Sequence, residues 1–370
     1  MRSLIAITAF LVLGASAGTA LAYPQYQMSK EQTCVACHVS PSGGGLLNDY
    51  GELTAEEESQ WGGNPAFLHG VLTLPDVLRV GGDLRAAGGV HTRGDGLGGA
   101  AFPMQSELYA YAEKSGVGLY LIGGATVEGG SMDSRSLVPF SREHYLIWRK
   151  SDSEGLYVRA GRFMPVQGLR QPEHVLYARR FGGTPLFSET YGANFGWIKP
   201  DLEAHASIFV ADPLIDGIER GDGGAFYVEK RFGNKSVGLV DRYTTSATDT
   251  RFHGGVTGKM WLEGKKLLLS TELQGIRQNF KQDAPTRVQL VGNLMATYFA
   301  RPGLFIDVAL GHFDEDTAIA KDERDAVDVN IHFFPLSHLE LILTTRYQMI
   351  GLGSGGDASG FSLLQVHYRI

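Results

Sequence analysis

The feature that most constrains the fold is a period-two alternation of apolar and polar residues from about residue 77 to the C terminus. It is clearest around residues 327–333, 339–348 and 364–370, where valine, leucine and isoleucine alternate with polar or charged residues. Such segments form β-strands with one apolar and one polar face. Alternation alone fits both a soluble β-sandwich and a transmembrane β-barrel, which differ in the face that points inward.

The links between candidate strands separate these two folds, because long and short links alternate along the whole stretch. Long links are expected near residues 93–102, 128–139, 165–189, 211–222, 245–250, 278–286, 313–324 and 349–359. Short turns centre on residues 114–116, 151–155, 200–201, 233–234, 263–265, 301–303 and 335–337. Bacterial outer-membrane barrels have short periplasmic turns and long external loops. The sequence therefore predicts an all-β protein, with residues 76–370 forming a porin-like transmembrane antiparallel β-barrel of about 16 strands.

Composition agrees with a membrane barrel and excludes other classes. Glycine is abundant at 49 residues, and the mean hydropathy of −0.08 is close to neutral. After residue 22 there is no run of about 18 apolar residues, which argues against a helical membrane protein. The net charge of −7 gives no reason to expect a nucleic-acid partner.

Residues 1–22 are interpreted as a secretory signal peptide. Arg2 supplies the charged start, an apolar run follows from Leu4 to about Leu13, and the segment ends in Ala20-Leu-Ala22. The apolar run is shorter than the ~20 residues that a spanning helix needs. The prediction is export to the outer membrane of a Gram-negative bacterium.

The motif Cys34-Val-Ala-Cys37-His38 predicts covalent attachment of one haem c. Two thiols at this spacing can form thioethers to one porphyrin, and the adjacent His38 can ligate its iron, so His38 is the metal ligand. These are the only two cysteines of the chain, and no matching Cys or His pair nearby suggests zinc. A thioredoxin-type redox pair would require a βαβ setting.

Residues 23–75 are expected to form a monohaem cytochrome c-type segment. Fewer than ~50 residues build little core unaided, so the segment is predicted to fold around the haem and against the barrel. An even number of strands places both barrel ends on the periplasmic side, so the haem segment is expected at the periplasmic mouth or inside the barrel. For the sixth iron ligand, the candidates by residue type are Met28, His69 and His174, with no preference among them.

The longest link carries apolar residues interleaved with Arg170, Arg179 and Arg180. One interpretation is an inward constriction whose arginines meet haem propionates or other anions. The alternative is that these arginines pair with barrel carboxylates. Acids predicted to face the lumen (Asp307, Asp328, Glu340) and the acidic loop at residues 314–316 could concentrate cations, although ordinary pore lining explains them as well.

Two features resemble a known family. Gly161-Arg-Phe-Met-Pro165 with Gly168 is similar to a signature of phosphate-selective-type porins, and a C-x-x-C-H segment ahead of such a barrel resembles the fused monohaem cytochrome–porins. That family includes outer-membrane iron oxidases of iron-oxidising bacteria. The resemblance implies an electron-transfer protein of the outer membrane, possessing one haem c on Cys34, Cys37 and His38. Its implied partners are extracellular Fe(II) and a periplasmic cytochrome or other electron carrier.

The chain departs from the iron-oxidising members after His38, where Pro41, three glycines and Tyr50-Gly51 replace a Phe-Pro and a Leu-Thr-x-Phe-Gly run. Two other functions therefore stay open. One is a diffusion porin whose haem segment is a plug or redox gate. The other is a periplasmic haem enzyme, such as a peroxidase, on a soluble β-domain. Oligomerisation is also left open, since it rests on fold analogy alone.

Overall fold

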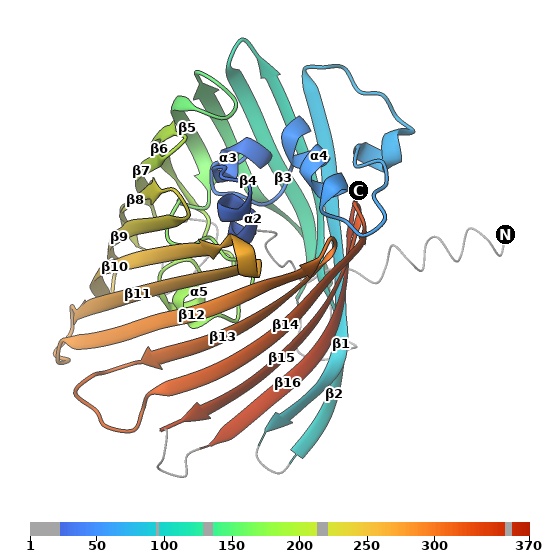
Figure 1. Cartoon of the computed structure of the whole chain (residues 1–370). Helices are drawn as coiled ribbons and strands as arrows, with labels where there is room; N and C mark the ends of the chain where they lie inside the picture. Colours follow the sequence, from blue (N-terminus) through green and yellow to red (C-terminus); the bar gives the residue numbers. More distant parts are fainter. Residues whose placement is uncertain (1–22, 94–95, 129–135, 213–220, 352–356) are drawn as a thin grey trace.

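Sixteen strands form a closed antiparallel barrel in the computed structural model, which describes residues 23–93, 96–128, 136–212, 221–351 and 357–370 (Figure 1). The strands are β1 (Leu78–Arg93), β2 (Gly96–Lys114), β3 (Val117–Glu128), β4 (Ser136–Arg149), β5 (Gly155–Phe163), β6 (Thr190–Lys199), β7 (Leu202–Val210), β8 (Asp222–Phe232), β9 (Lys235–Thr245), β10 (Asp249–Leu262), β11 (Leu267–Phe280), β12 (Arg287–Arg301), β13 (Leu304–Asp314), β14 (Arg324–Leu336), β15 (Leu339–Ile350) and β16 (Ala358–Arg369). Each strand pairs with its neighbours in sequence. The predicted all-β barrel of about 16 strands is confirmed.

The barrel closes by pairing its first and last strands. The register of β1 with β16 runs from Asp83 opposite Arg369 to Arg93 opposite Ser359. The last residue, Ile370, donates its amide to the Gly82 carbonyl at 2.8 Å. The chain end is thus part of the closure, as expected for a barrel whose final strand completes the sheet.

The predicted alternation of links is largely present, with two corrections. Strand β2 begins at Gly96, so the expected long link at 93–102 is wrong, because its glycine- and alanine-rich residues continue the strands. Only three residues separate β9 from β10, so the link at 245–250 is also short. The central parts of the links at 128–139, 211–222 and 349–359 lie outside the described residues, as does the predicted signal peptide.

The two faces of the barrel have the polarity of a membrane protein. Outward side chains such as Leu239, Leu294 and Leu310 are about half exposed, at 50–51%. Inward, Asp307 and Asp328 are fully buried. An apolar exterior around a polar interior is the arrangement expected in lipid, and it does not fit a soluble β-domain. Among the described residues, no helix is long and apolar enough to cross a membrane.

The helices α2, α3 and α4 of the N-terminal segment lie within the outline of the barrel rather than beside it (Figure 1). It contains α2 (Pro24–Ser29), α3 (Cys34–Cys37), α4 (Asp49–Glu57) and the 3-10 helix η1 (Phe67–Gly70). The link between β5 and β6 also folds inward and carries α5 (Tyr177–Phe181), while η3 (Glu263–Lys265) lies in the turn after β10. The predicted inward loop is confirmed.

A charged side chain on the lipid-facing surface should destabilise the barrel by an amount that depends on its depth in the membrane. Leu239→Arg, near the middle of β9, should destabilise the folded barrel by ~2–4 kcal/mol, because the guanidinium would face the hydrocarbon core. Val237→Arg, two residues from the strand end, is the control and should cost only ~0–1 kcal/mol. Reversible urea unfolding in lipid vesicles measures both. Equal costs at the two positions would contradict the proposed membrane depth.

Candidate functional site

The Cys34–Cys37 stretch folds as the single-turn helix α3, and His38 leaves this turn in an extended conformation. The His38 amide donates to the Cys34 carbonyl at 3.0 Å. An isolated β-bridge then pairs His38 with Leu47. Both thiols and the imidazole therefore come from one compact turn with a fixed exit.

Three consecutive glycines form the loop that connects His38 to Leu47. Gly43, Gly44 and Gly45 have φ angles of 77°, 71° and 62°, in the left-handed region that glycine adopts without strain. A Cβ atom on Gly45 would lie only 2.5 Å from the hydroxyl of Tyr120. The side-chain-poor turn lets the loop approach the barrel wall closely.

Asn48 joins this turn to α4. Its side chain caps the helix by accepting a hydrogen bond from the Gly51 amide at 2.9 Å, and its Nδ2 donates to the Val35 carbonyl at 3.2 Å. The Asn48 amide also donates to the Cys37 carbonyl at 3.0 Å. One asparagine thus fixes the position of α4 against the motif.

Buried arginines on the wall and the inward loop hold the segment. Arg159, which is 1% exposed, lies over the ring of Phe163 at 4.1 Å and donates to Ser42 Oγ at 2.8 Å. Arg170 pairs with Glu203 at 2.6 Å and donates to the Pro41 carbonyl at 3.4 Å. The glycine loop is therefore bonded to both the wall and the inward loop.

A second set of bonds fixes the start of the segment. Gln27 on α2 donates to Glu203 at 2.8 Å and accepts from Lys259, which also pairs with Glu229 at 2.7 Å. The Arg231 guanidinium donates to the Gln32 carbonyl at 2.9 Å. These partners are charged lumen side chains of β7, β8 and β10.

The end of α4 pairs with the backbone of short turns. The Gly303 amide donates to the Glu58 carbonyl at 2.6 Å, and the Gln60 amide donates to the Phe334 carbonyl at 2.8 Å. The Ser337 amide donates to the Gly62 carbonyl at 3.1 Å. The segment therefore sits at the short-turn end of the barrel and extends into the lumen.

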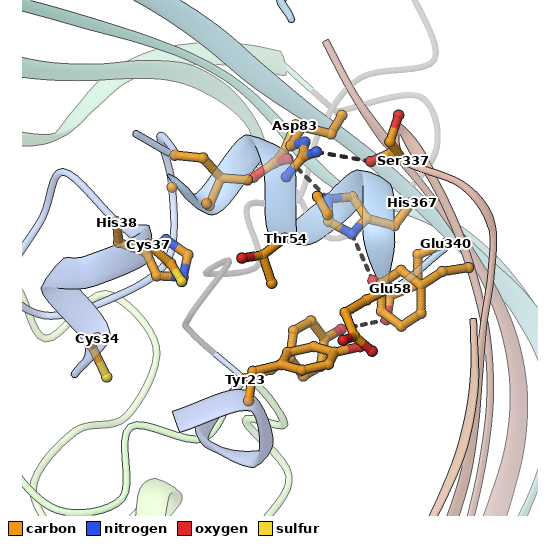
Figure 2. Close-up of a pocket in the computed structure, with 18 of the residues that line it drawn as sticks. Tyr23, Cys34, Cys37, His38, Thr54, Glu58, Asp83, Ser337, Glu340 and His367 are labelled. Atoms are coloured by element: carbon orange, nitrogen blue, oxygen red, sulfur yellow. Dashed lines mark hydrogen bonds and ion pairs between the residues drawn. The ribbon is translucent and has the colours of Figure 1, made fainter. Parts of the chain in front are cut away.

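Cys34, Cys37 and His38 all open into one cavity inside the barrel. The space, counted with its opening to solvent, is about 1060 Å³. Figure 2 shows the motif on one side and Asp83, Glu340 and His367 on the opposite side. Two thiols and an imidazole on one wall of a cavity are the groups that a c-type haem requires.

Burial determines the ionisation of the motif. It raises the pKa of the Cys34 thiol, and burial together with the neighbouring Cys34 raises the pKa of Cys37 to about 11. Burial, followed by the Arg369 charge, lowers the pKa of His38 to about 4. The imidazole is therefore neutral at neutral pH, the form that ligates a metal.

None of the three candidate sixth ligands lines this cavity within the described part of the chain. Met28 is buried against the barrel on α2. His69 lies 4.1 Å from His338 between ring centroids and shares a 2.7 Å hydrogen bond with the Tyr368 hydroxyl. His174 lies on the inward loop. The structure thus gives no support to any of the three.

The three loop arginines have different environments, and within the described residues none of them lines the cavity of the motif. Arg170 pairs with the barrel carboxylate of Glu203, as the alternative interpretation expected. Arg179 is buried and donates to the Gln171 carbonyl at 2.9 Å, within the loop itself. Arg180 is exposed and lies over the ring of Phe181 at 5.3 Å. Arg369, which lines the cavity, is the better-placed cation for an anionic group there.

Toward the long-loop end, arginines line a second, wider space of about 1700 Å³, counted with its opening to solvent. They are Arg180, Arg242, Arg251, Arg287 and Arg324. Glu315 pairs with two of them, Arg287 and Arg324, at 3.0 Å each. Two arginines thus neutralise Glu315, which gives no support to a cation-concentrating role of the acidic loop at this residue.

Sequence reasoning missed several residues of the cavity wall. Tyr23, Tyr26, His367 and Arg369 line the cavity together with the predicted lumen acid Glu340. His367 and Arg369 stand on the polar face of the last alternating strand, which signalled that they face the lumen. No local signal showed that this strand faces the motif, because that proximity depends on how the N-terminal segment enters the barrel.

The docking bonds predict that Arg170 holds the segment in the lumen. Arg170→Ala removes the partner of the buried Glu203, at a cost of up to ~3–5 kcal/mol, so residues 23–75 should become sensitive to protease while the barrel stays resistant. Arg180→Ala, an exposed arginine of the same loop, is the control and should behave as wild type. Limited proteolysis followed by mass spectrometry measures this. Equal protection in both variants would contradict the docking role.

Solved structures with a similar fold include outer-membrane proteins, one of them described as a porin. OmpT of Vibrio cholerae, expressed in the outer membrane, matches with a TM-score of 0.59 at 12% identity, covering 81% of this chain and 100% of that chain. OmpF of Salmonella typhi matches with a TM-score of 0.61 at 10% identity over 79% and 97% of the two chains. An anion-selective porin from Comamonas acidovorans matches with a TM-score of 0.58 at 12% identity over 79% and 99%. No family model and no curated protein matches this sequence. At these identities, the likeness establishes a porin-type barrel.

Proposed function

We propose that this chain is an outer-membrane electron conduit that binds one haem c on Cys34, Cys37 and His38 inside a porin-type barrel. The observation that carries the proposal is that both thiols and the imidazole open into one cavity within a closed barrel. The inverted polarity of the barrel and its porin neighbours support a place in the outer membrane. Short periplasmic turns would then orient the cavity toward the periplasm.

When bound, the haem would supply a one-electron redox centre within an otherwise insulating membrane. The residues of the chain position it. Cys34 and Cys37 would form the thioethers, and the neutral His38 would ligate the iron from the turn fixed by Asn48. Arg369 and the apolar wall around Leu47 and Tyr26 would neutralise and desolvate the group.

Electrons would leave at the short-turn end, where α4 reaches the mouth of the barrel and a periplasmic cytochrome or other carrier can approach. The donor would come from the long-loop end. Extracellular Fe(II) is the donor implied by the resemblance to the cytochrome–porins, and the activity would then be Fe(II) oxidation.

A second candidate function, a diffusion pore, is favoured by the arginine-lined space at the long-loop end. Arg242 there lies over Phe209 at 4.7 Å and donates to Gln167 at 3.3 Å, and no carboxylate pairs with it among the described interactions. Such a surface attracts anions. In this alternative, the N-terminal segment is a plug or redox gate for an anionic solute.

His38→Ala tests the haem assignment. The variant should still fold as a barrel, seen as heat-modifiable migration on a gel, because His38 lies outside the sixteen strands and alanine keeps its backbone bridge to Leu47. Its reduced absorption bands should shift or disappear, because the iron loses an axial ligand. An unchanged haem spectrum would remove His38 as the ligand.

Electron transfer across a membrane is tested with the haem-loaded protein in liposomes, long loops outward, with an oxidised cytochrome trapped inside. External Fe(II) should reduce the trapped cytochrome, and Cys34→Ala/Cys37→Ala, which cannot hold the haem covalently, should not transmit electrons. Absence of transfer, together with anion-selective conductance across a planar bilayer, would instead favour the diffusion pore.

A further inference from the structure

Three buried side chains from different parts of the chain converge beside the haem cavity. Glu173 comes from the inward loop, Asp307 from β13 and His332 from β14. One ligand atom from each lies within 4.8 Å of the others. Asp307 is fully buried, His332 is 1% exposed, and the Glu173 side chain is 10% exposed. The loop and the barrel wall thus bring together a mixed nitrogen and oxygen donor set.

The distances within this group match those between ligands of one metal ion. His332 Nε2 lies 3.2 Å from Asp307 Oδ2 and 3.7 Å from Glu173 Oε1. Ligands at ~2.0–2.2 Å from a common ion are separated by roughly 3–3.6 Å in tetrahedral or octahedral geometry. The Glu173 oxygen lies just outside this range from His332 and within 4.8 Å of the Asp307 oxygen, so the Glu173 side chain would have to move closer when an ion binds.

Buried atoms of the group point at one another without a satisfying hydrogen bond. Within the described residues, no hydrogen bond of acceptable geometry reaches Asp307 Oδ2, His332 Nε2 or Glu173 Oε2. Asp307 Oδ2 and His332 Nε2 lie 3.2 Å apart as an ion pair, whereas Glu173 Oε2 has no hydrogen-bond partner within the described residues. Buried polar atoms are nearly always satisfied, so the unpartnered carboxylate oxygen beside this pair points to a further partner. A cation shared by the two carboxylates would compensate both of their charges.

The histidine is oriented as a metal ligand would be. His332 Nδ1 lies 3.0 Å from Glu340 Oε1, so the imidazole can donate there and direct its Nε2 lone pair toward Asp307 and Glu173. A carboxylate on the far nitrogen of a ligating histidine is a recurrent feature of metal sites. The ring of Phe305 stacks on His332 with centroids 4.4 Å apart and fixes its plane.

We propose that Glu173, Asp307 and His332 bind one divalent transition-metal ion, and that Fe(II) bound there is the immediate electron donor to the haem. One nitrogen and two carboxylate donors suit Fe(II), Mn(II), Co(II) or Zn(II). The second half of this proposal rests on the proposed function. The metal-binding half stands on the geometry alone.

Two residues connect the metal site to the haem cavity. Glu340, which bonds to His332, lines the cavity, and so does Tyr23, whose hydroxyl donates to Glu340. The Tyr23 ring also packs edge-on against His332 with centroids 5.6 Å apart. Either side chain alone therefore spans the gap between the metal site and the cavity, which is a short distance for electron tunnelling.

The redox step balances without another reactant. Fe(II) at the site loses one electron and becomes Fe(III), and the ferric haem iron gains that electron and becomes ferrous. No bond to carbon or hydrogen is broken. The periplasmic carrier of the proposed function then removes the electron, and Fe(III) must leave or be replaced before the next turnover.

Metal binding is measured by titrating the full-length, haem-loaded protein in detergent with Mn(II), using the EPR signal of free Mn(II). Wild type should bind one Mn(II) ion per chain. Glu173→Gln and Asp307→Asn should each weaken this binding at least tenfold. Glu173→Gln changes only the loop, so it spares the barrel strands, and heat-modifiable migration reports folding.

Asp328→Asn is the matched control, because Asp328 is an equally buried lumen carboxylate on β14 that faces Arg346 at 3.4 Å instead. Its Mn(II) affinity should stay within twofold of wild type. If wild type binds Mn(II) no better than the Glu173→Gln/Asp307→Asn double variant, the metal site is overturned.

Stopped-flow absorbance tests the donor half. Glu173→Gln should reduce its haem at least tenfold more slowly than wild type with Fe(II), yet at the same rate with dithionite. Mn(II) binding with unchanged Fe(II) kinetics would overturn the donor role. Mn(II) binding in a protein whose haem ignores Fe(II) would overturn both this donor role and the Fe(II) part of the proposed function, and would leave the site. Fe(II) reduction without Mn(II) binding would overturn the site and leave the proposed function.

Discussion

The rest of the structure depends on the burial of charge inside a barrel whose outer face is apolar. The lumen holds many inward-facing charged groups, and each needs a partner there because lipid on the outside offers none. Arg142 is one example of such pairing within the wall, since it lies between Glu107 at 2.8 Å and Glu189 at 2.7 Å. Where the wall cannot supply the partner, the inward loop and the N-terminal segment do.

This requirement explains why a short segment without a core of its own adopts one position. A residue such as Gln27 meets Glu203 and Lys259 at once, and Ser42 bonds to both Arg159 and the Met164 carbonyl. Removing one partner of a buried charge costs far more than the pair gains over an apolar contact. The network therefore determines where the segment lies more than it increases the free energy of unfolding. A cofactor site depends on such a fixed position of its residues.

The sequence was sufficient to predict the barrel, because the alternation of apolar and polar residues identifies each strand independently of the others. The polar positions of β13, β14 and β15 predicted that Asp307, Asp328 and Glu340 face the lumen, and all three are buried there. The spacing of Cys34, Cys37 and His38 also singled out three residues that open into one cavity. Strand ends were less certain, because the glycine-rich start of β2 has no alternation to extend.

What lies opposite the motif could not be predicted, since it depends on contacts between residues some 300 positions apart. Glu340 and His367 share a 2.9 Å contact on neighbouring strands, but nothing in their local sequence places Tyr23 or Cys37 across from them. No choice among the sixth-ligand candidates could be made for the same reason. The candidate ligands were named by residue type, whereas the path of residues 23–62 through the lumen determines which side chains line the cavity.

The cavity at Cys34, Cys37 and His38 and the group of Glu173, Asp307 and His332 cannot vary independently. Glu340 accepts from Tyr23 and contacts His332 and His367, so it belongs to the cavity wall and to the orientation of His332 together. His367 in turn contacts Asp83 at 2.9 Å on β1, the strand that closes the barrel. A change of charge at Glu340 would therefore alter the cavity wall, the carboxylate–histidine group beside it and the seam between the first and last strands. Barrel closure, the cavity and the group beside it thus share one hydrogen-bonded network.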